Sequence, residues 1–184
     1  MIVEKTPLEG LLLIKPNVHE DKRGYFYENY RDELFEANGL PTNFRQDNQT
    51  KSVKGTLRGL HYQLKYPQGK LVRVSFGIVY DVAVDIRKTS PTFSHYFGVN
   101  LTDKDHIQMY IPPGFAHGFC VLSDQAIFQY KCTEIYHPED EFGIRWDDPQ
   151  ININWSITDP VISDRDLELP FLAEQKNIPV YGGK

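Results

Sequence analysis

The stretch TLRGLHYQLKYPQGKLVRV, residues 56–74, has the composition of β-strand but carries many polar and ionisable side chains. They include Arg58, His61, Gln63, Lys70 and Arg73. A strand face that packs a core selects Val, Ile, Leu and aromatic residues, so cations and a histidine are rarely placed there. The stretch therefore predicts a functional site sunk into a β-sheet.

Other parts of the chain predict further short strands. Residues 80–87 alternate between apolar and polar side chains, which indicates a strand with one apolar and one polar face. Residues 115–122 and 126–133 predict two strands that form a hairpin around the turn 123–125. Residues 46–49 are either a turn or a set of amide groups that face a cavity. The remaining expected elements are strands at 11–14, 96–101 and 109–111, a polar loop at 19–22 and a helix at 31–38 that ends at Gly39.

The spacing of these elements indicates an all-β protein. Strands recur roughly every ten residues, and the 13 Gly and 12 Pro supply tight turns. We expect an antiparallel sandwich or barrel, which can hold a ligand between its sheets. A chain of 184 residues fits one domain. The Asp-, Pro- and Trp-rich segment from Glu139 onward is expected to wrap the sheet.

The composition excludes several classes of partner. The chain has 20 Lys and Arg against 25 Asp and Glu, a formal charge of −5 and a pI near 5.7. A general nucleic-acid or anionic-membrane surface is therefore not expected, and an anion would bind in a local pocket. The apolar run at 11–14 is too short to span a membrane. Cys120 and Cys132 lie in apolar runs, and we interpret them as reduced core residues of a cytoplasmic protein.

His61 is the candidate for acid–base chemistry, because imidazole titrates near neutral pH. The alternative is a core histidine with both nitrogens satisfied, but Gln63, Lys70 and the second histidine, His117, favour a functional one. Arg58 and Lys70 are suited to a phosphate or a developing oxyanion, the alternative being surface cations.

The spacing of Arg58 and His61 raises a question of geometry. An odd separation puts them on opposite faces of a regular strand, but Gly59 between them is a place where a bulge brings both into one cavity. Tyr130 is expected on the same strand face as Phe128 and Cys132. The spacing does not decide whether it is a core aromatic or a phenol that donates a proton.

A metal site competes with this interpretation. Barrels that bind iron, manganese or nickel usually carry a His-x-His pair with a following Glu and a later His. Here the position two after His61 is Gln63, and an amide is a poor ligand for transition metals. His61 and His117 leave such a site short of ligands, so no metal is expected.

Seven segments together resemble one protein family. They are DKRGYF at 21–26, QDN at 46–48, LRGLHYQ at 57–63, QGKLVR at 68–73, DVAVDIR at 81–87, PPGFAHGF at 112–119 and WDDP at 146–149. With them, nearly the whole chain is similar to the dTDP-4-dehydrorhamnose 3,5-epimerases of the rhamnose pathway. The resemblance implies a cupin-type jelly-roll barrel of antiparallel strands with a few short helices. It also implies one domain over 1–184, with N-terminal strands exchanged in a dimer.

The resemblance further implies a proton shuttle that needs no cofactor. The substrate is a 4-keto-6-deoxy sugar on thymidine diphosphate, whose C3 and C5 hydrogens both flank the ketone. On the family's pattern His61 is the base, and Asp166 orients it. Lys70 stabilises the enolate at O4, and Tyr130 returns a proton on the other face.

Similarity also implies the residues that bind the substrate. Arg58 and Arg23 hold the diphosphate or nearby sugar oxygens. Phe26 and Glu28 lie in a segment that reaches across a dimer in the family, so a homodimer is expected. The other residues expected in the nucleotide and sugar pocket are Gln46, Asn48, His117, Tyr136, Glu141 and Arg165.

The chain departs from the family near this pocket. Arg165 stands where many members have Lys, and Ile135–Tyr136 stands where a pair of tyrosines is frequent. Asp81 is a plausible carboxylate partner for His117. The first expectation is epimerisation at C3 and C5 of dTDP-4-dehydro-6-deoxy-glucose in dTDP-rhamnose biosynthesis. The alternatives are a C3-only epimerase, and then a cupin that binds a metal or a nucleotide sugar.

Overall fold

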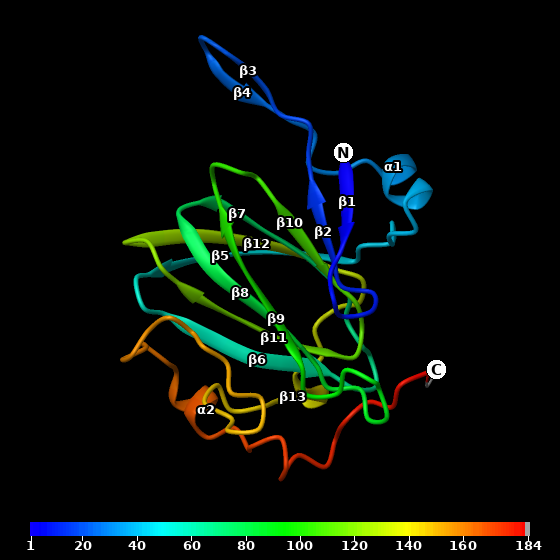
Figure 1. Cartoon of the computed structure of the whole chain (residues 1–184), viewed down its shortest axis with the longest axis vertical. Helices are drawn as coiled ribbons and strands as arrows, with labels where there is room; N and C mark the ends of the chain where they lie inside the picture. Colours follow the sequence, from blue (N-terminus) through cyan, green and yellow to red (C-terminus); the bar gives the residue numbers. More distant parts are fainter. Residues whose placement is uncertain (183–184) are drawn as a thin grey trace.

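The structure is a computed structural model that describes residues 1–182, and two antiparallel sheets dominate it (Figure 1). In the described part of the chain, the first sheet has the order β1 (Ile2–Lys5), β2 (Leu12–Lys15), β10 (Gln108–Ile111), β7 (Lys70–Phe76), β12 (Gln125–Cys132) and β5 (Gln46–Val53). The second sheet has the order β13 (Glu141–Gly143), β6 (Leu57–Gln63), β11 (Phe115–Val121), β8 (Ile78–Asp85) and β9 (Tyr96–Thr102). The predicted antiparallel jelly roll is confirmed.

The main core fills the space between the two sheets. Val72 and Val74 of β7 and Phe128 of β12 pack against Ala83 of β8 and Phe119 of β11, and each is at most 5% exposed. Fully burying a side chain of the size of Val or Phe stabilises a fold by about 1.5–3 kcal/mol. Burial of these apolar residues fixes which positions of each strand point inward, and polar residues at other inward positions are held between the sheets as well.

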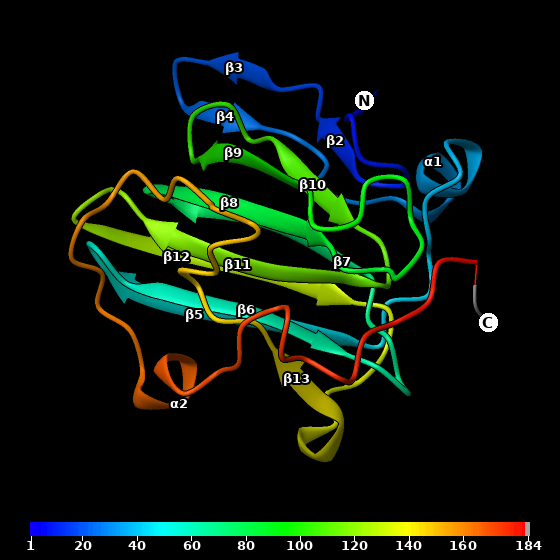
Figure 2. The ribbon, with the colours of Figure 1, turned by 60° about the horizontal axis from the view of Figure 1, so that its bottom comes forward.

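The second sheet is covered on its outer face as well. Residues from Ile144 onward run across it in Figure 2, and Trp155 and Leu172 are buried there. This segment thus lies over the outer face of the second sheet. The alternation predicted for residues 80–87 is confirmed, since Val82, Val84 and Ile86 pack under this segment while Ala83 packs in the core between the sheets. Asp81 and Asp85 are fully buried because both sides of β8 are covered, and each has a partner.

The predicted hairpin over residues 115–133 is wrong. β11 pairs with β6 and β8, whereas β12 pairs with β5 and β7, so the connection crosses from the second sheet to the first. The crossing is held by other strands, since Ser123 Oγ accepts from Ile78 N at 2.8 Å and the Asp124 carbonyl accepts from Lys54 N at 3.0 Å. Residues 123–125 have the composition of a hairpin turn, but the pairing of β11 and β12 with distant strands makes this connection a crossover between the sheets.

The N-terminal region contains a separate hairpin. β3 (His19–Asp21) and β4 (Gly24–Phe26) pair with each other and project away from both sheets (Figure 1). The loop expected at 19–22 is therefore mostly strand. The helix α1 (Asp32–Ala37) is confirmed, with Asn38 at its C-cap and Gly39 at a φ of +71°. The remaining helical elements of the described residues are the 3₁₀ turn η1 (Pro138–Asp140) and α2 (Asp164–Leu167).

Candidate active site

A cavity of about 410 Å³ lies between the two sheets. Its walls come from β5, β7 and β12 on one side and from β6 and β11 on the other, with β13 and α2 at the rim. The predicted site residues that line it are Gln46, Asn48, Arg58, His61, Lys70, His117, Tyr130, Tyr136, Glu141, Arg165 and Asp166. The structure thus brings together all of the predicted site residues except Arg23, Phe26 and Glu28.

Gly59 explains how Arg58 and His61 reach the same cavity. The pairing of β6 with β11 shifts register beside this glycine, and its φ is +106°. A Cβ at Gly59 would lie 2.5 Å from the His117 carbonyl oxygen, so this position requires glycine. The predicted bulge is confirmed, and it turns both side chains to the cavity.

His61 is held by a carboxylate from the far end of the sequence. Its Nε2 lies 2.8 Å from Asp166 Oδ1, and Asp166 Oδ2 accepts the Gly59 N–H at 3.1 Å. Ser163 caps α2 by accepting the Asp166 N–H, which fixes the start of this short helix. With Nε2–H donating to Asp166, the lone pair of Nδ1 is free to act as a base.

The charge of Asp166 is favoured in spite of its burial. Burial opposes the carboxylate, but the hydrogen bonds from His61, from the Gly59 N–H and from Ser163 outweigh it, and the pKa of Asp166 falls below its ordinary value. An ionised Asp166 holds the imidazole in one orientation and stabilises the imidazolium that forms when the ring takes a proton.

Lys70 and Tyr130 lie on neighbouring strands of the first sheet. Burial lowers the pKa of the Lys70 ammonium, and the nearby carboxylates of Glu141 and Asp81 oppose this shift. Burial raises the pKa of the Tyr130 phenol, so it is protonated at neutral pH and available as a donor. The cavity therefore holds an imidazole, a lysine side chain and a neutral phenol.

Glu141 joins three other residues at the rim. Its Oε2 accepts the Tyr136 hydroxyl at 2.8 Å and forms an ion pair with Arg165. Its Oε1 lies 3.9 Å from His61 Nδ1. Arg165 and Tyr136 thus lie at this rim, and Ile135 precedes Tyr136 in the chain.

His117 and Gln63 have their own partners. His117 Nε2 lies 3.0 Å from Asp81 Oδ1, so the expected contact between these buried side chains is confirmed. Gln63 Oε1 accepts the His137 N–H at 2.8 Å, and its Nε2 donates to the Tyr66 carbonyl at 2.7 Å. The residue at the His-x-His position is therefore committed to the backbone of the adjoining loop. Among residues 1–182, no group of three or more His, Cys, Asp or Glu side chains is arranged to hold a metal ion.

Arg23, Phe26 and Glu28 do not lie in this cavity. Phe26 is 72% exposed on the β3–β4 hairpin, and the Arg23 guanidinium donates to Asp21 at 2.6 Å in the same hairpin. Glu28 accepts from Arg31 at 3.0 Å. Whatever role these residues have is not fulfilled within the cavity of their own chain.

Sequence reasoning missed several residues of the cavity wall. They are Thr50, Gln68, Gly118, Phe119, Phe128, Cys132 and Ser163. Two of them could have been predicted from strand alternation. Thr50 shares a strand face with Gln46 and Asn48, and Cys132 shares one with Tyr130. Asn48 Nδ2 donates to Cys132 Sγ at 3.8 Å, which links the two strands.

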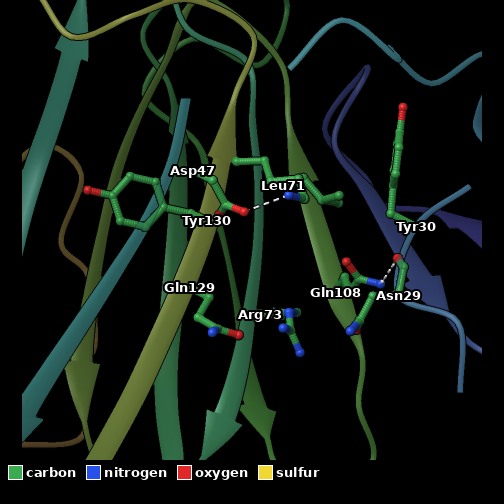
Figure 3. Close-up of a pocket in the computed structure, with 9 residues that line it drawn as sticks. Asn29, Tyr30, Asp47, Leu71, Arg73, Gln108, Gln129 and Tyr130 are labelled. Carbon is green, nitrogen blue, oxygen red and sulfur yellow. Dashed lines mark hydrogen bonds and ion pairs between the residues drawn. The ribbon is translucent and has the colours of Figure 1, made fainter. Parts of the chain in front are cut away.

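A second cavity, of about 320 Å³, lies on the reverse of the strands that carry Lys70 and Tyr130 (Figure 3). In Figure 3 the Tyr130 ring points away from the group around Arg73 and Gln108. Gln108 Nε2 donates to the Asn29 carbonyl at 2.8 Å, which ties the segment after the β3–β4 hairpin to the outer face of the first sheet. The two faces of this sheet are thus chemically distinct.

Comparison with known proteins identifies the family of the chain. The family described as dTDP-4-dehydrorhamnose 3,5-epimerase matches residues 5–174. A dTDP-4-dehydrorhamnose 3,5-epimerase of Methanothermobacter thermautotrophicus is 51% identical over 96% of each chain. One of Shigella flexneri is 53% identical over 91% of this chain and 93% of its own.

Solved structures agree with these relatives. The epimerase RmlC of Legionella pneumophila, solved with dTDP-4-keto-L-rhamnose, has a TM-score of 0.94 at 46% identity and 98% coverage of both chains. ChmJ, a 3′-monoepimerase of Streptomyces bikiniensis solved with dTDP-quinovose, has a TM-score of 0.90 at 33% identity, covering 96% of this chain and 92% of its own. In the described residues, no helix is both long and apolar enough to cross a membrane. The chain belongs to the dTDP-4-dehydrorhamnose 3,5-epimerase family.

Proposed function

We propose that this protein inverts C3 and C5 of dTDP-4-dehydro-6-deoxy-glucose to give dTDP-4-dehydrorhamnose, in dTDP-rhamnose biosynthesis. The observation that carries the proposal is the grouping of His61, with Asp166 behind it, and of Lys70 and Tyr130 in one cavity. Family membership and the relatives' names support the choice of substrate.

The chemistry follows from the position of the ketone. A proton on C3 or C5 is acidified by the C4 carbonyl, and its removal leaves an enolate with charge on O4. His61 Nδ1 takes the proton, and the Lys70 ammonium stabilises the charge where it develops. Tyr130 then donates a proton from the opposite face, which inverts the carbon. These side chains carry out each inversion without a cofactor.

The remaining residues of the cavity bind the nucleotide sugar. Arg58 supplies positive charge and N–H donors for the diphosphate, and His117, held in place by Asp81, lines the cavity as well. Tyr136, Glu141 and Arg165 border the part of the cavity next to His61. The other polar contacts to the sugar and nucleotide come from Gln46 and Asn48.

The β3–β4 hairpin completes the site of a second copy in a homodimer. Arg23 and Phe26 are exposed on an element that projects from its own chain, and charged and aromatic residues so placed are suited to a partner. Arg23 joins Arg58 at the diphosphate, while Phe26 and Glu28 close the partner's cavity. A cytoplasmic location fits the buried free thiols of Cys120 and Cys132.

Deuterium exchange followed by proton NMR tests this function. The purified protein is incubated in D₂O with dTDP-4-keto-6-deoxy-glucose, and deuterium is followed at C3 and C5. Label at both carbons, with dTDP-rhamnose formed when a partner reductase is added, is the expected result. No exchange at either carbon contradicts the proposal and favours a cupin that binds a nucleotide sugar.

Epimerisation at C3 alone is the second candidate. It is favoured by the two expected departures from the family's pattern, Arg165 at the rim and Ile135 beside Tyr136, and by the similarity to a 3′-monoepimerase. In the same NMR experiment this alternative predicts label at C3 alone. A metal-dependent cupin is tested separately, since activity that survives exhaustive chelation, with no stoichiometric metal in the protein, contradicts it.

A further inference from the structure

The proposed function leaves His61 and Tyr130 in the wrong protonation states after each inversion. When a C–H bond breaks, its proton moves to His61 and its electrons form the enolate. When the enolate takes the Tyr130 proton, a tyrosinate remains. The same pair must invert a second carbon, so the imidazolium has to release a proton and the tyrosinate has to gain one before that step.

The proton does not leave readily through Asp166. This carboxylate is 4% exposed, and its second oxygen accepts the Gly59 N–H at 3.1 Å. Asp166 also stays ionised, because its hydrogen bonds favour the charged form. The proton that His61 takes from the substrate lies on Nδ1, on the other side of the ring from Asp166.

Glu141 is the carboxylate that faces Nδ1. Its Oε1 lies 3.9 Å from that nitrogen, about 1 Å longer than a hydrogen bond, a gap that a small side-chain rotation closes once the imidazolium is charged. Its Oε2 is held by Tyr136 and Arg165, so one oxygen is fixed while the other faces the base. The Glu141 side chain is 13% exposed, against 6% for that of Asp166, and its ion-pair partner Arg165 is 59% exposed, so Glu141 lies nearer to solvent than Asp166 does.

We propose that Glu141 is the proton exit of His61, which accepts the Nδ1 proton after each abstraction and passes it to water. The groups that face Glu141 are His61 from β6, Lys70 from β7, Tyr130 from β12, Tyr136 from the loop before η1 and Arg165 from α2. The tyrosinate of Tyr130 regains its proton from water, so no proton is gained or lost overall. This role rests on the proposed function and adds proton release to the binding role expected of Glu141.

The substitution Glu141→Gln separates proton release from binding and from the first abstraction. The amide keeps the shape of the side chain but does not carry the proton away. With saturating substrate in D₂O and rapid quenching, we expect a burst of one exchanged carbon per active site. Later turnovers should then be roughly 10- to 100-fold slower than this burst. Loss of a residue that only positions or binds the sugar would slow the first exchange and the later turnovers equally, with no burst.

Rescue by a small acid gives an independent readout. Formate added to Glu141→Gln should restore the slow phase in proportion to its concentration, and chloride at the same ionic strength should not. Glu139→Gln is the matched control, because the Glu139 side chain lies on the adjacent η1 turn, is 71% exposed and is outside the cavity. It should show wild-type rates and no burst.

Two results would overturn the inference. One is a first exchange slowed as much as the steady state with no rescue by formate, and the other is wild-type steady-state exchange in Glu141→Gln. The wild-type protein distinguishes the two levels of the argument. If it exchanges neither carbon, the proposed function fails; if it exchanges both and the variant shows no burst, the proton exit alone fails.

Discussion

The cavity between the sheets and the β3–β4 hairpin satisfy their charged groups in different ways. In the cavity, Asp166 is buried and receives hydrogen bonds from residues more than 100 positions away, His61 and Gly59. In the hairpin, Arg23 bonds Asp21, two residues away, and both side chains are exposed. The first arrangement is fixed by the fold of one chain, whereas the second is local.

The two regions accordingly have different proposed roles in the site. The groups that handle protons are rigidly placed within one chain, because packed strands and long-range hydrogen bonds leave their side chains few alternatives. Tyr25 of the hairpin packs against His106, but the Arg23 side chain makes only the local bonds to Asp21, so we expect its surroundings to be completed by a second chain. The predictions below test each side of this comparison.

Replacing the base should have the largest effect. His61→Asn keeps a polar side chain beside Asp166 but has no basic nitrogen, so kcat should fall roughly 10²–10⁴-fold. Calorimetric titration with dTDP should give nearly the wild-type affinity, and circular dichroism should show a folded protein. Activity within tenfold of the wild type would remove His61 from the mechanism.

Removing the acid should affect inversion more than proton loss. Tyr130→Phe keeps the ring against Phe128 but lacks the hydroxyl. Product formation should fall roughly 100-fold, while exchange of substrate hydrogens into D₂O stays within about tenfold of the wild type. The matched control is Tyr110→Phe, since Tyr110 is half-buried on β10, outside the cavity. Equal losses of exchange and inversion in Tyr130→Phe would contradict its assignment as the acid.

The sequence predicts the cavity better than it predicts the sheets. Arg58 and His61 could be brought together because Gly59 signals a bulge, a local property. The position of β12 could not be predicted in the same way. Ser123–Gln125 has turn composition whether the chain folds back as a hairpin or crosses to the other sheet, and long-range pairing makes the choice.

The same limit applies to the buried carboxylates and to the start of α2. Alternation marks Asp81 and Asp85 as one face of a strand, but it does not reveal that this face lies inside the barrel, opposite the face that the C-terminal segment covers. Ser163 is recognisable as a helix cap. Its place at the cavity depends on α2 packing beside β6. Asp166 was found by resemblance to a family, and its contact with His61 follows from that packing.

The hairpin is tested by mixing two defective chains. Arg23→Ala should weaken activity roughly tenfold, because one cation at the diphosphate is lost. If hairpins act in the partner's site, a mixed dimer with His61→Asn contains one site with a normal base and a normal hairpin. Refolding the two variants together should then restore about a quarter of wild-type activity. Activity no higher than that of the separate variants would show that Arg23 does not act across chains.

The smallest expected effect is a difference in the pH dependence of folding stability between variants of two aspartates. The pKa of Asp166 is lowered by buried hydrogen bonds, and that of Asp21 is lowered by its exposed neighbour Arg23. A carboxylate with a lowered folded pKa stabilises the fold above its unfolded pKa, near 3.9, and loses that contribution as the pH falls through the folded pKa. Urea unfolding at fixed protein concentration should therefore show Asp166→Asn less stable than wild type at pH 7, with the difference shrinking below about pH 4. Asp21→Asn should match wild type at both pH values, because water and salt screen an exposed pair. A pH-dependent loss as large in Asp21→Asn as in Asp166→Asn would mean that the hairpin is already packed against another surface.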